Sequence, residues 1–221
     1  MISIIVPVLN EEKKLPDLLS HLQKFRDQGH EVIIVDGGSV DNSLMLAQSS
    51  ADNVIVSRKG RSIQMNSGAS VANGDVLLFL HSDTLLPEAA LETIENFVPE
   101  SFWGRFDVSL SSDKFIFRVI ESFINLRSRL TSINTGDQAI FIETQLFNAV
   151  SGFPEIALME DVAISKKLKK IIAPICLKQR VISSSRRWES RGVVTTVFLM
   201  WKLRLYYFFG VSPDRLNQLY R

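Results

Sequence analysis

Acidic side chains follow two apolar runs in the first part of the chain, where they could bind a nucleotide and a cation. Asp36 and Asp41 flank a glycine pair in Asp36-Gly37-Gly38-Ser39-Val40-Asp41, and Asp83 comes shortly after the apolar run that ends at Leu80. A carboxylate after the first of these runs can accept hydrogen bonds from a nucleobase N–H or a ribose hydroxyl. The glycines let a flat ring approach the backbone. A carboxylate beside a diphosphate can hold Mg²⁺ or Mn²⁺, because both cations prefer oxygen ligands.

Polar residues in two other segments are open to two interpretations. Asn10 and Glu11 could line a ligand site, or Asn10 could cap the next helix while Glu11 favours its positive end. The segment Arg58-Lys59-Gly60-Arg61, followed by Gln64 and Asn66, could supply hydrogen-bond donors to a nucleotide or form a solvated basic loop. Which interpretation applies depends on the elements that position these residues.

The first eighty residues alternate short β-branched runs with helical patterns. We expect strands over 2–6, 32–35, 54–56 and 76–80, and helices over 15–25, 42–48 and 64–72. Continuous apolar strands joined by helices are typical of a parallel sheet that is covered on both faces. Ligands of such sheets bind at the carboxyl ends of the strands, which is where the polar residues fall. The predicted fold class is therefore α/β.

The second half is less regular, and it predicts a mixed set of elements. We expect strands over 103–110, 139–142 and 175–183, and helices over 87–97, 114–130, 143–150, 161–170 and 189–209. We interpret the chain as a single domain with a nucleotide-binding half over 1–84 and an acceptor and catalytic half over 85–221.

Composition narrows the classes of function. The 221 residues are 46% hydrophobic and carry a formal net charge of +1, which does not indicate a broadly basic surface for nucleic acid. The apolar run at the N-terminus is short and lacks a basic flank, so it predicts a strand and not a signal peptide. Lys202 and Arg204 interrupt the nearest candidate for a membrane span, 193–211. A cytoplasmic location is expected.

Seven motifs, taken in this order, resemble family 2 glycosyltransferases with the GT-A fold. They are Pro7-Val8-Leu9-Asn10-Glu11-Glu12, Asp36-Gly37-Gly38-Ser39-Val40-Asp41, His81-Ser82-Asp83, Gly136-Asp137-Gln138, Gly152-Phe153-Pro154, Met159-Glu160-Asp161 and Arg186-Arg187-Trp188. The resemblance covers essentially the whole chain. It implies a Rossmann-like, mostly parallel central sheet flanked by helices, with a mixed C-terminal half. It also implies metal-assisted transfer of a sugar, with inversion, from a nucleotide diphosphate sugar to an acceptor hydroxyl. UDP is the favoured nucleotide, and the acceptor is not identified.

The resemblance also implies roles for matching residues. Asp161, in its pair with Glu160, would deprotonate the acceptor, and Asp83 would hold Mg²⁺ or Mn²⁺. The sugar or acceptor pocket would include Gly136, Asp137 and Gln138. The nucleotide and diphosphate would lie near Pro7, Asn10, Glu11, Asp36, Gly38, Ser39, Asp41, Arg61, Gln64, Asn66, Ser82, Arg186, Arg187 and Trp188. Simpler alternatives remain: the acidic pair could only favour the start of a helix, Asp137 could be a turn residue, and the arginines could be surface charge.

His81 departs from the family pattern, because it takes the place of the first acidic residue of the D-x-D motif. It could be a nitrogen ligand of the metal, a hydrogen-bond donor to phosphate, or a packed residue. A catalytically silent nucleotide-binding member is therefore one alternative. A nucleotidyltransferase that makes sugar nucleotides is another. It would usually need a glycine-rich loop after the first strand, and 7–12 contains no glycine.

An apolar stripe near the C-terminus also has two interpretations. It comprises Val194, Val197, Phe198, Trp201, Leu205 and Phe208. Core packing is the default interpretation of such a stripe. Trp, Tyr and basic residues beside an apolar face also suit a membrane interface. The helix expected over 114–130 likewise combines apolar residues with arginines. The alternative is thus peripheral contact with the inner face of a membrane.

Overall fold

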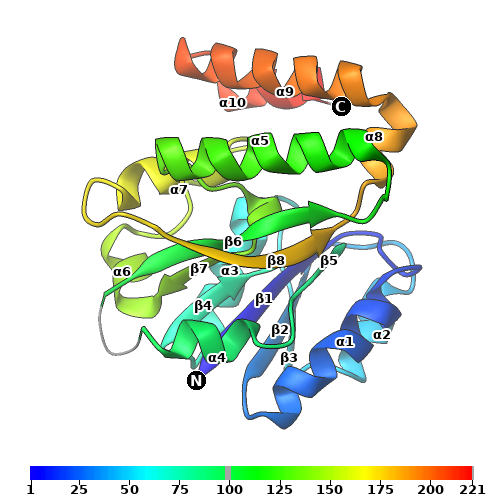
Figure 1. Cartoon of the computed structure of the whole chain (residues 1–221). Coiled ribbons are helices and arrows are strands. Elements are labelled where there is room, and N and C mark those ends of the chain that lie inside the picture. The colour runs from blue at the N-terminus through cyan, green and yellow to red at the C-terminus, as the bar shows by residue number, and fades with distance from the viewer. Residues whose placement is uncertain (98–100, 221) are drawn as a thin grey trace.

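The fold is built on one mixed sheet, shown by a computed structural model that describes residues 1–97 and 101–220. Its strand order is β3-β2-β1-β4-β7-β6-β8-β5 (Figure 1). The strands are β1 (Ile2–Val8), β2 (Glu31–Asp36), β3 (Asn53–Val56), β4 (Val76–Phe79), β5 (Thr84–Leu85), β6 (Trp103–Leu110), β7 (Ile140–Glu143) and β8 (Ile175–Ser183).

The N-terminal half has the predicted parallel arrangement. Strand β1 pairs in parallel with β2 on one side and β4 on the other, and β2 pairs in parallel with β3. The carboxyl ends of β1, β2 and β4 therefore adjoin. In the second half β7 runs antiparallel to both β4 and β6, and β8 runs parallel to β6 and antiparallel to β5. Together these pairings form a GT-A type of α/β fold.

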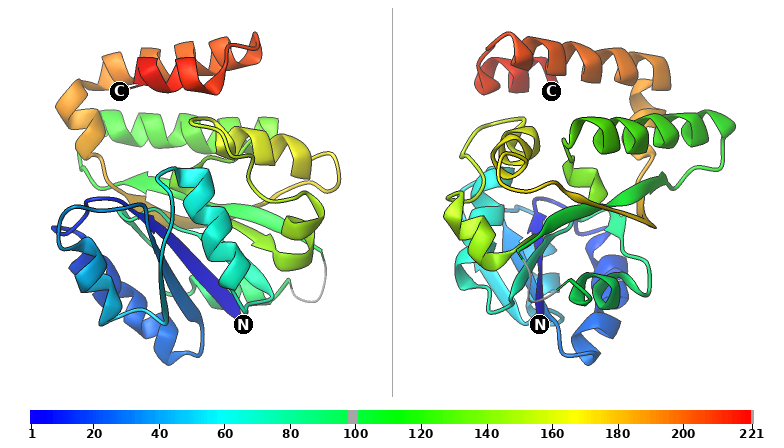
Figure 2. Two further views of the ribbon diagram at one scale, coloured as in Figure 1. Left: turned by 180° about the vertical axis from the view of Figure 1, so that it is seen from behind. Right: turned by 60° about the vertical axis from the view of Figure 1, so that its left-hand side comes forward.

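Helices cover both faces of the sheet (Figure 2). They are α1 (Leu15–Asp27), α2 (Ser43–Gln48), α3 (Arg61–Val71), α4 (Ala90–Glu95), α5 (Phe115–Thr131), α6 (Thr144–Ala149), α7 (Glu160–Leu168), α8 (Arg186–Arg191), α9 (Val193–Phe208) and α10 (Pro213–Tyr220). Alternation along β1 shows the two layers: Ile2 and Ile4 pack with α1, α2 and α4, whereas Ile5 packs with α3, α6 and α7.

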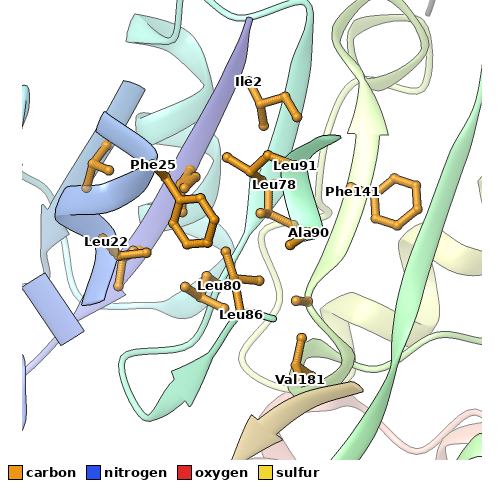
Figure 3. Close-up of a cluster of buried hydrophobic side chains, with 14 of the residues drawn as sticks. Ile2, Leu22, Phe25, Leu78, Leu80, Leu86, Ala90, Leu91, Phe141 and Val181 are labelled. Carbon is orange, nitrogen blue, oxygen red and sulfur yellow. The ribbon is translucent and has the colours of Figure 1, made fainter. Parts of the chain in front are cut away.

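The larger core lies under α1 and α4 (Figure 3). Leu22 and Phe25 of α1 pack there with Ile2 of β1 and Leu78 of β4, and all four are fully buried. Burying one such side chain contributes about 1.5–3 kcal/mol. This core fixes the positions of the strand ends that carry the polar loops.

The helical tail differs from the prediction. The predicted single helix over 189–209 is two helices, α8 and α9, because Gly192 between them has a φ of +84° that ends a right-handed helix. Helix α10 and the two-residue strand β5 were not predicted. The predicted helix over 87–97 is the shorter α4. Helices α9 and α10 pack on α7 through Leu203 and Leu216. Within 1–97 and 101–220, no helix is long and apolar enough to cross a membrane.

Candidate active site

Asp36 lies where β2 ends and presents one unused oxygen. Its Oδ1 accepts hydrogen bonds from the backbone N–H groups of Gly38 and Ser39, each at 2.8 Å. The residue is 1% exposed, and its Oδ2 is buried without a partner in the described structure. A buried acceptor without a donor is costly, so Oδ2 is poised to accept a hydrogen bond from a ligand.

The loops after β1 and β2 hold each other in place. The N–H of Asn10 donates to Ser39 Oγ at 2.9 Å, and Asn10 Oδ1 accepts from the N–H of Val40 at 2.9 Å. Asp41 accepts from the N–H of Glu12 at 3.1 Å and of Ser43 at 3.0 Å. Helix α1 begins at Leu15, so the alternative that Asn10 caps it is wrong. These polar side chains brace the rim of the site.

Two amides of α3 also bind backbone. Gln64 Nε2 donates to the carbonyls of Val8 and Val35, both at 2.8 Å, and so joins the ends of β1 and β2. Asn66 donates to the carbonyl of Phe153 at 2.8 Å and accepts from its N–H at 3.0 Å. Phe153 is buried, as expected for a turn with a buried ring. Both amides thus shape the wall beneath the loops, and their contact with a nucleotide stays a prediction.

Asp83 lies beside Glu11 and Arg186, after β4. Arg186 Nη2 is 3.9 Å from Glu11 Oε2. Burial raises the pKa of Glu11, Arg186 opposes the rise, and the nearby Asp83 carboxylate adds to it. Pro7 and Ser82 lie at the same edge of the sheet. Pro7 is near the carboxyl end of β1, and Ser82 lies between β4 and Asp83. The structure thus brings Glu11, Asp83 and Arg186 together, and their contact with a diphosphate stays a prediction.

Asp83 and Glu11 supply two carboxylates, the ligand type that a hard cation prefers. The Asp83 carboxylate accepts no hydrogen bond from the described residues, so both of its oxygens are available, and the Glu11 carboxylate lies nearby. Mg²⁺ is usually held by one or two carboxylates together with substrate phosphates. Among the residues described, no group of three His, Cys, Asp or Glu side chains could hold a metal by itself.

His81 points to a different part of the site from Asp83. Its imidazole packs against Gly136, and its Nε2 is buried with no partner among the described residues. Burial, assisted by the positive charge of Arg61, holds the pKa of His81 well below its usual value, so the ring is neutral. It lines a small pocket with the carboxylates of α7. The full lining is Arg61, Met65, Phe79, His81, Gly136, Ile140, Phe153, Glu160 and Asp161.

Glu160 and Asp161 begin α7 and face this pocket. Asp161 accepts hydrogen bonds from the N–H groups of Gly136 at 3.1 Å and Val162 at 2.7 Å. Burial raises its pKa against these two bonds. Glu160 lies 3.9 Å from Arg61, and burial together with Asp161 raises the pKa of Glu160 to about 6. The pair therefore stands at a helix start and also lines the pocket, and a raised pKa strengthens Asp161 as a proton acceptor.

The Gly136-Asp137-Gln138 segment forms a short 3-10 helix whose residues have different surroundings. Gly136 contacts both His81 and Asp161, as described above. Asp137 Oδ1 is buried without a partner in the described structure. Gln138 is fully buried and donates to Ser128 Oγ at 3.0 Å, while accepting from the N–H of Thr135 at 3.2 Å. Gln138 thus braces α5, and Gly136 is the member that lines the pocket.

The three residues of Arg186-Arg187-Trp188 also diverge. Arg187 stacks on the ring of Tyr220 with its guanidinium 3.7 Å from the ring centroid, and it donates to the Tyr220 hydroxyl. Trp188 packs beside the apolar cluster of Leu110, Phe117 and Ile120. Arg186 alone of the three forms an ion pair with Glu11. The motif therefore joins the part of the site that holds Glu11 to α5 and to α10.

Three residues near Asp161 were not predicted to belong to the site: Arg127 of α5, and Arg204 and Tyr207 of α9. The charge of Arg204 lowers the pKa of Asp161, and the Asp161 charge raises that of Tyr207, whose pKa is mainly raised by burial. Burial, with Arg204, lowers the pKa of Arg127 to about 10. The basic residues were visible on predicted helices, but periodicity does not reveal which part of the sheet a helix covers.

Parallel βα units whose carboxyl ends carry carboxylates, joined to a mixed second half, are the arrangement of the GT-A fold. The family model described as glycosyl transferase family 2 matches residues 3–150. The chain belongs to that family.

Two relatives and two solved structures illustrate the similarity. A PGL/p-HBAD biosynthesis glycosyltransferase of Mycobacterium bovis is 32% identical over 166 residues, covering 69% of this chain and 63% of that protein. An undecaprenyl-phosphate 4-deoxy-4-formamido-L-arabinose transferase of Proteus mirabilis is 35% identical over 97 residues, covering 39% of this chain and 30% of that protein. The chain thus spans less than two thirds of the length of either.

The solved structures share the fold. TarS 1-349 of S. aureus in complex with UDP-GlcNAc has a TM-score of 0.66 at 23% identity, covering 83% of this chain and 58% of that one. The mannosyltransferase PcManGT of Pyrobaculum calidifontis in complex with GDP-Man and Mn²⁺ has a TM-score of 0.67 at 15% identity. The match covers 99% of this chain and 67% of that one.

Proposed function

We propose that this protein transfers a sugar from a nucleotide diphosphate sugar to an acceptor hydroxyl, with inversion and with help from a divalent cation. The observation that carries the proposal is the small pocket that Asp161, held by the N–H of Gly136, lines together with His81, two residues before Asp83. The family of the chain and the nucleotide sugars bound by its structural neighbours support the donor class.

On the donor side, each group has a distinct task. The free Oδ2 of Asp36 accepts a hydrogen bond from the nucleoside. Arg186 binds diphosphate oxygens, for which its planar guanidinium is well matched. Asp83, with Glu11 nearby, would hold Mg²⁺ or Mn²⁺, and such a cation neutralises charge on the leaving diphosphate when bound. UDP is the nucleotide we favour, in line with the UDP-GlcNAc complex of TarS.

On the acceptor side, Asp161 takes the proton of the attacking hydroxyl. The acceptor oxygen forms a bond to the anomeric carbon from the face opposite the diphosphate. The bond from that carbon to the diphosphate oxygen breaks, and its electron pair leaves with the diphosphate. A general base of this kind contributes about 10²–10⁴-fold to the rate. A protonated His81 would lower the pKa of Asp161 and so weaken it as a base. Because His81 is neutral, Asp161 is spared this effect.

The acceptor we propose is carried by a lipid, at the inner face of a membrane. The support is the aromatic and basic residues on the mostly apolar helix α9, and the name of the Proteus mirabilis relative, which includes undecaprenyl phosphate. A cytoplasmic protein that contacts the membrane peripherally would meet such an acceptor at the surface.

The test is donor turnover by the purified chain. We expect hydrolysis or transfer from UDP-sugars that depends on added Mn²⁺ or Mg²⁺ and is lost in Asp83→Asn. Asp161→Asn should lower transfer by about 10²–10⁴-fold while nucleotide binding, followed by thermal shift, is kept. Asp113→Asn, on the loop before α5, is the control. Nucleotide binding without turnover under any metal would establish a silent binder, and formation of a sugar nucleotide from nucleoside triphosphate would establish a nucleotidyltransferase.

A further inference from the structure

Helix α9 has an apolar stripe on the side opposite its packed face. Leu203 is buried against α7 and α10, and Thr196 on the same side is also buried, whereas Val194, Phe198, Trp201, Leu205 and Phe208 are exposed. Their spacing of three and four residues places all five on one side of the helix. The default expectation that this stripe packs in the core is therefore wrong, because the opposite side of α9 does so.

A second apolar stripe lies on α5, at the same end of the molecule (Figures 1 and 2). Its members are Phe115, Phe123, Leu126 and Leu130, opposite the buried side chains of Phe117 and Asn125. The exposed fractions in the two stripes lie between 53% and 80%. Soluble monomers rarely expose so many large apolar side chains together, so this end of the molecule has the character of an interaction surface.

The charges around the stripes select the partner. Helix α9 contains no acidic residue, and its exposed Lys202 lies 5.5 Å from the centroid of the Tyr206 ring. Helix α5 begins after Lys114, and its three arginines have partners within the protein: Arg118 pairs with Glu121, Arg129 pairs with Asp107, and Arg127 donates to the carbonyl of Ile133. Residues 186–220 carry six basic and two acidic side chains, whereas the whole chain has a net charge of only +1, so positive charge is concentrated in this C-terminal segment. Aromatic and basic side chains around an apolar stripe match the headgroup region of an anionic bilayer.

We propose that the exposed stripes of α9 and α5 dock this protein on the surface of a membrane that contains anionic lipid. The residues of α9 would enter the headgroup region with the helix lying in the plane of the membrane. The proposed function adds a reason for this location: the inner side of α9 carries Arg204 and Tyr207, which face Asp161. A lipid-borne acceptor would then approach the proposed base along the helix that rests on the membrane.

Vesicle flotation tests the docking without any nucleotide or turnover. The probes are neutral phosphatidylcholine vesicles and anionic vesicles that also contain about 30% phosphatidylglycerol. Each is tested at low and at high salt. We expect the wild-type protein to float with the anionic vesicles and to be released as salt rises, because the headgroup attraction is screened. The double variant Phe198→Gln/Trp201→Gln should bind at least about tenfold more weakly, and Lys202→Gln about fivefold more weakly.

Met45→Gln is the matched control, since Met45 is 62% exposed on α2, far from α9 in Figure 1. All variants change exposed side chains, and unchanged thermal unfolding would show that each is folded. Flotation that fails for the wild type, or that is equal for wild type and Phe198→Gln/Trp201→Gln, would overturn the proposal. The proposal would also be overturned if the wild type formed a dimer, did not bind vesicles, and lost the dimer in Phe198→Gln/Trp201→Gln. Flotation without donor turnover would instead count against the proposed function alone.

Discussion

Replacing Gly136 by alanine should damage both the stability and the chemistry of this protein. A Cβ built at Gly136 lies 2.8 Å from His81 Cε1 and closer still to Nε2, whereas ordinary contact begins at 3.4 Å. The imidazole must therefore move by more than half an ångström, or the 136–138 turn must move away from it. The ring has little room for this, because it is packed beside Arg61 and the pocket wall.

The magnitude follows from overpacking. Inserting a methyl group into a well-packed site typically costs about 1–3 kcal/mol. The N–H of Gly136 also donates to Asp161 at 3.1 Å, so a shifted turn weakens the bond that orients the proposed base. We expect urea unfolding to show a loss of about 1–3 kcal/mol, and transfer to fall further than that stability loss would explain.

A double-mutant cycle with His81→Ala separates this cause from others. Removing the imidazole gives the new methyl group space, so Gly136→Ala should cost much less in the His81→Ala background than in the wild type. Gly38→Ala is a contrasting case, because its added Cβ meets no atom within 4 Å and the expected cost comes from its φ of +87° alone. Equal costs for Gly136→Ala in both backgrounds would refute the steric reasoning.

Three other predictions concern charge. The pKa of Glu160 is raised from 4.5 to about 6, so its carboxyl stabilises the fold when protonated. That contribution is lost as pH rises through about 6. Glu160→Gln has no such titration, so its free energy of unfolding in urea, relative to that of the wild type, should increase by about 2 kcal/mol from pH 4 to pH 7. Asp107→Ala should cost about 3–5 kcal/mol, because it leaves the fully buried Arg105 without its ion-pair partner; thermal or urea unfolding with no such loss would count against it. In Arg204→Gln the pKa of Asp161 should rise, so the acid limb of the pH–rate profile for transfer should move to higher pH, and an unmoved limb would contradict the contact.

The parallel half could be predicted because its signals are local and agree with one another. A short β-branched run such as Ile2–Val6 is typical of a buried strand, and Gly29, with a φ of +88°, ends the helix that follows. The strand-end rule then located Asp36, Asp83 and the loop that carries Glu11. The position of a residue just after a strand can be read from the order of the elements along the chain, so predicting these residues did not require knowledge of the packing.

The remaining part of the site depends on packing, which periodicity does not encode. Helix α9 is apolar on two sides, and the sequence does not show that Leu203 rather than Trp201 faces the protein. The amides of Gln64 and Gln138 could each serve a ligand, and in the structure they also satisfy buried backbone and side-chain groups. A hydrogen-bonding side chain has the same sequence signature in both roles, and only the neighbours brought by the fold decide between them.

If Asp36 contacts the nucleobase as proposed, its unpaired oxygen has a consequence for discrimination among bases. Because Gly38 and Ser39 occupy Oδ1 and no described residue serves Oδ2, the free protein already bears the cost of an unsatisfied acceptor. A base that presents an N–H there relieves this cost, while a base that presents a carbonyl or a ring nitrogen lone pair meets electrostatic repulsion. The empty protein is in this sense already selective, since it rejects an ill-matched base by repulsion and needs no extra contact to favour a matched one.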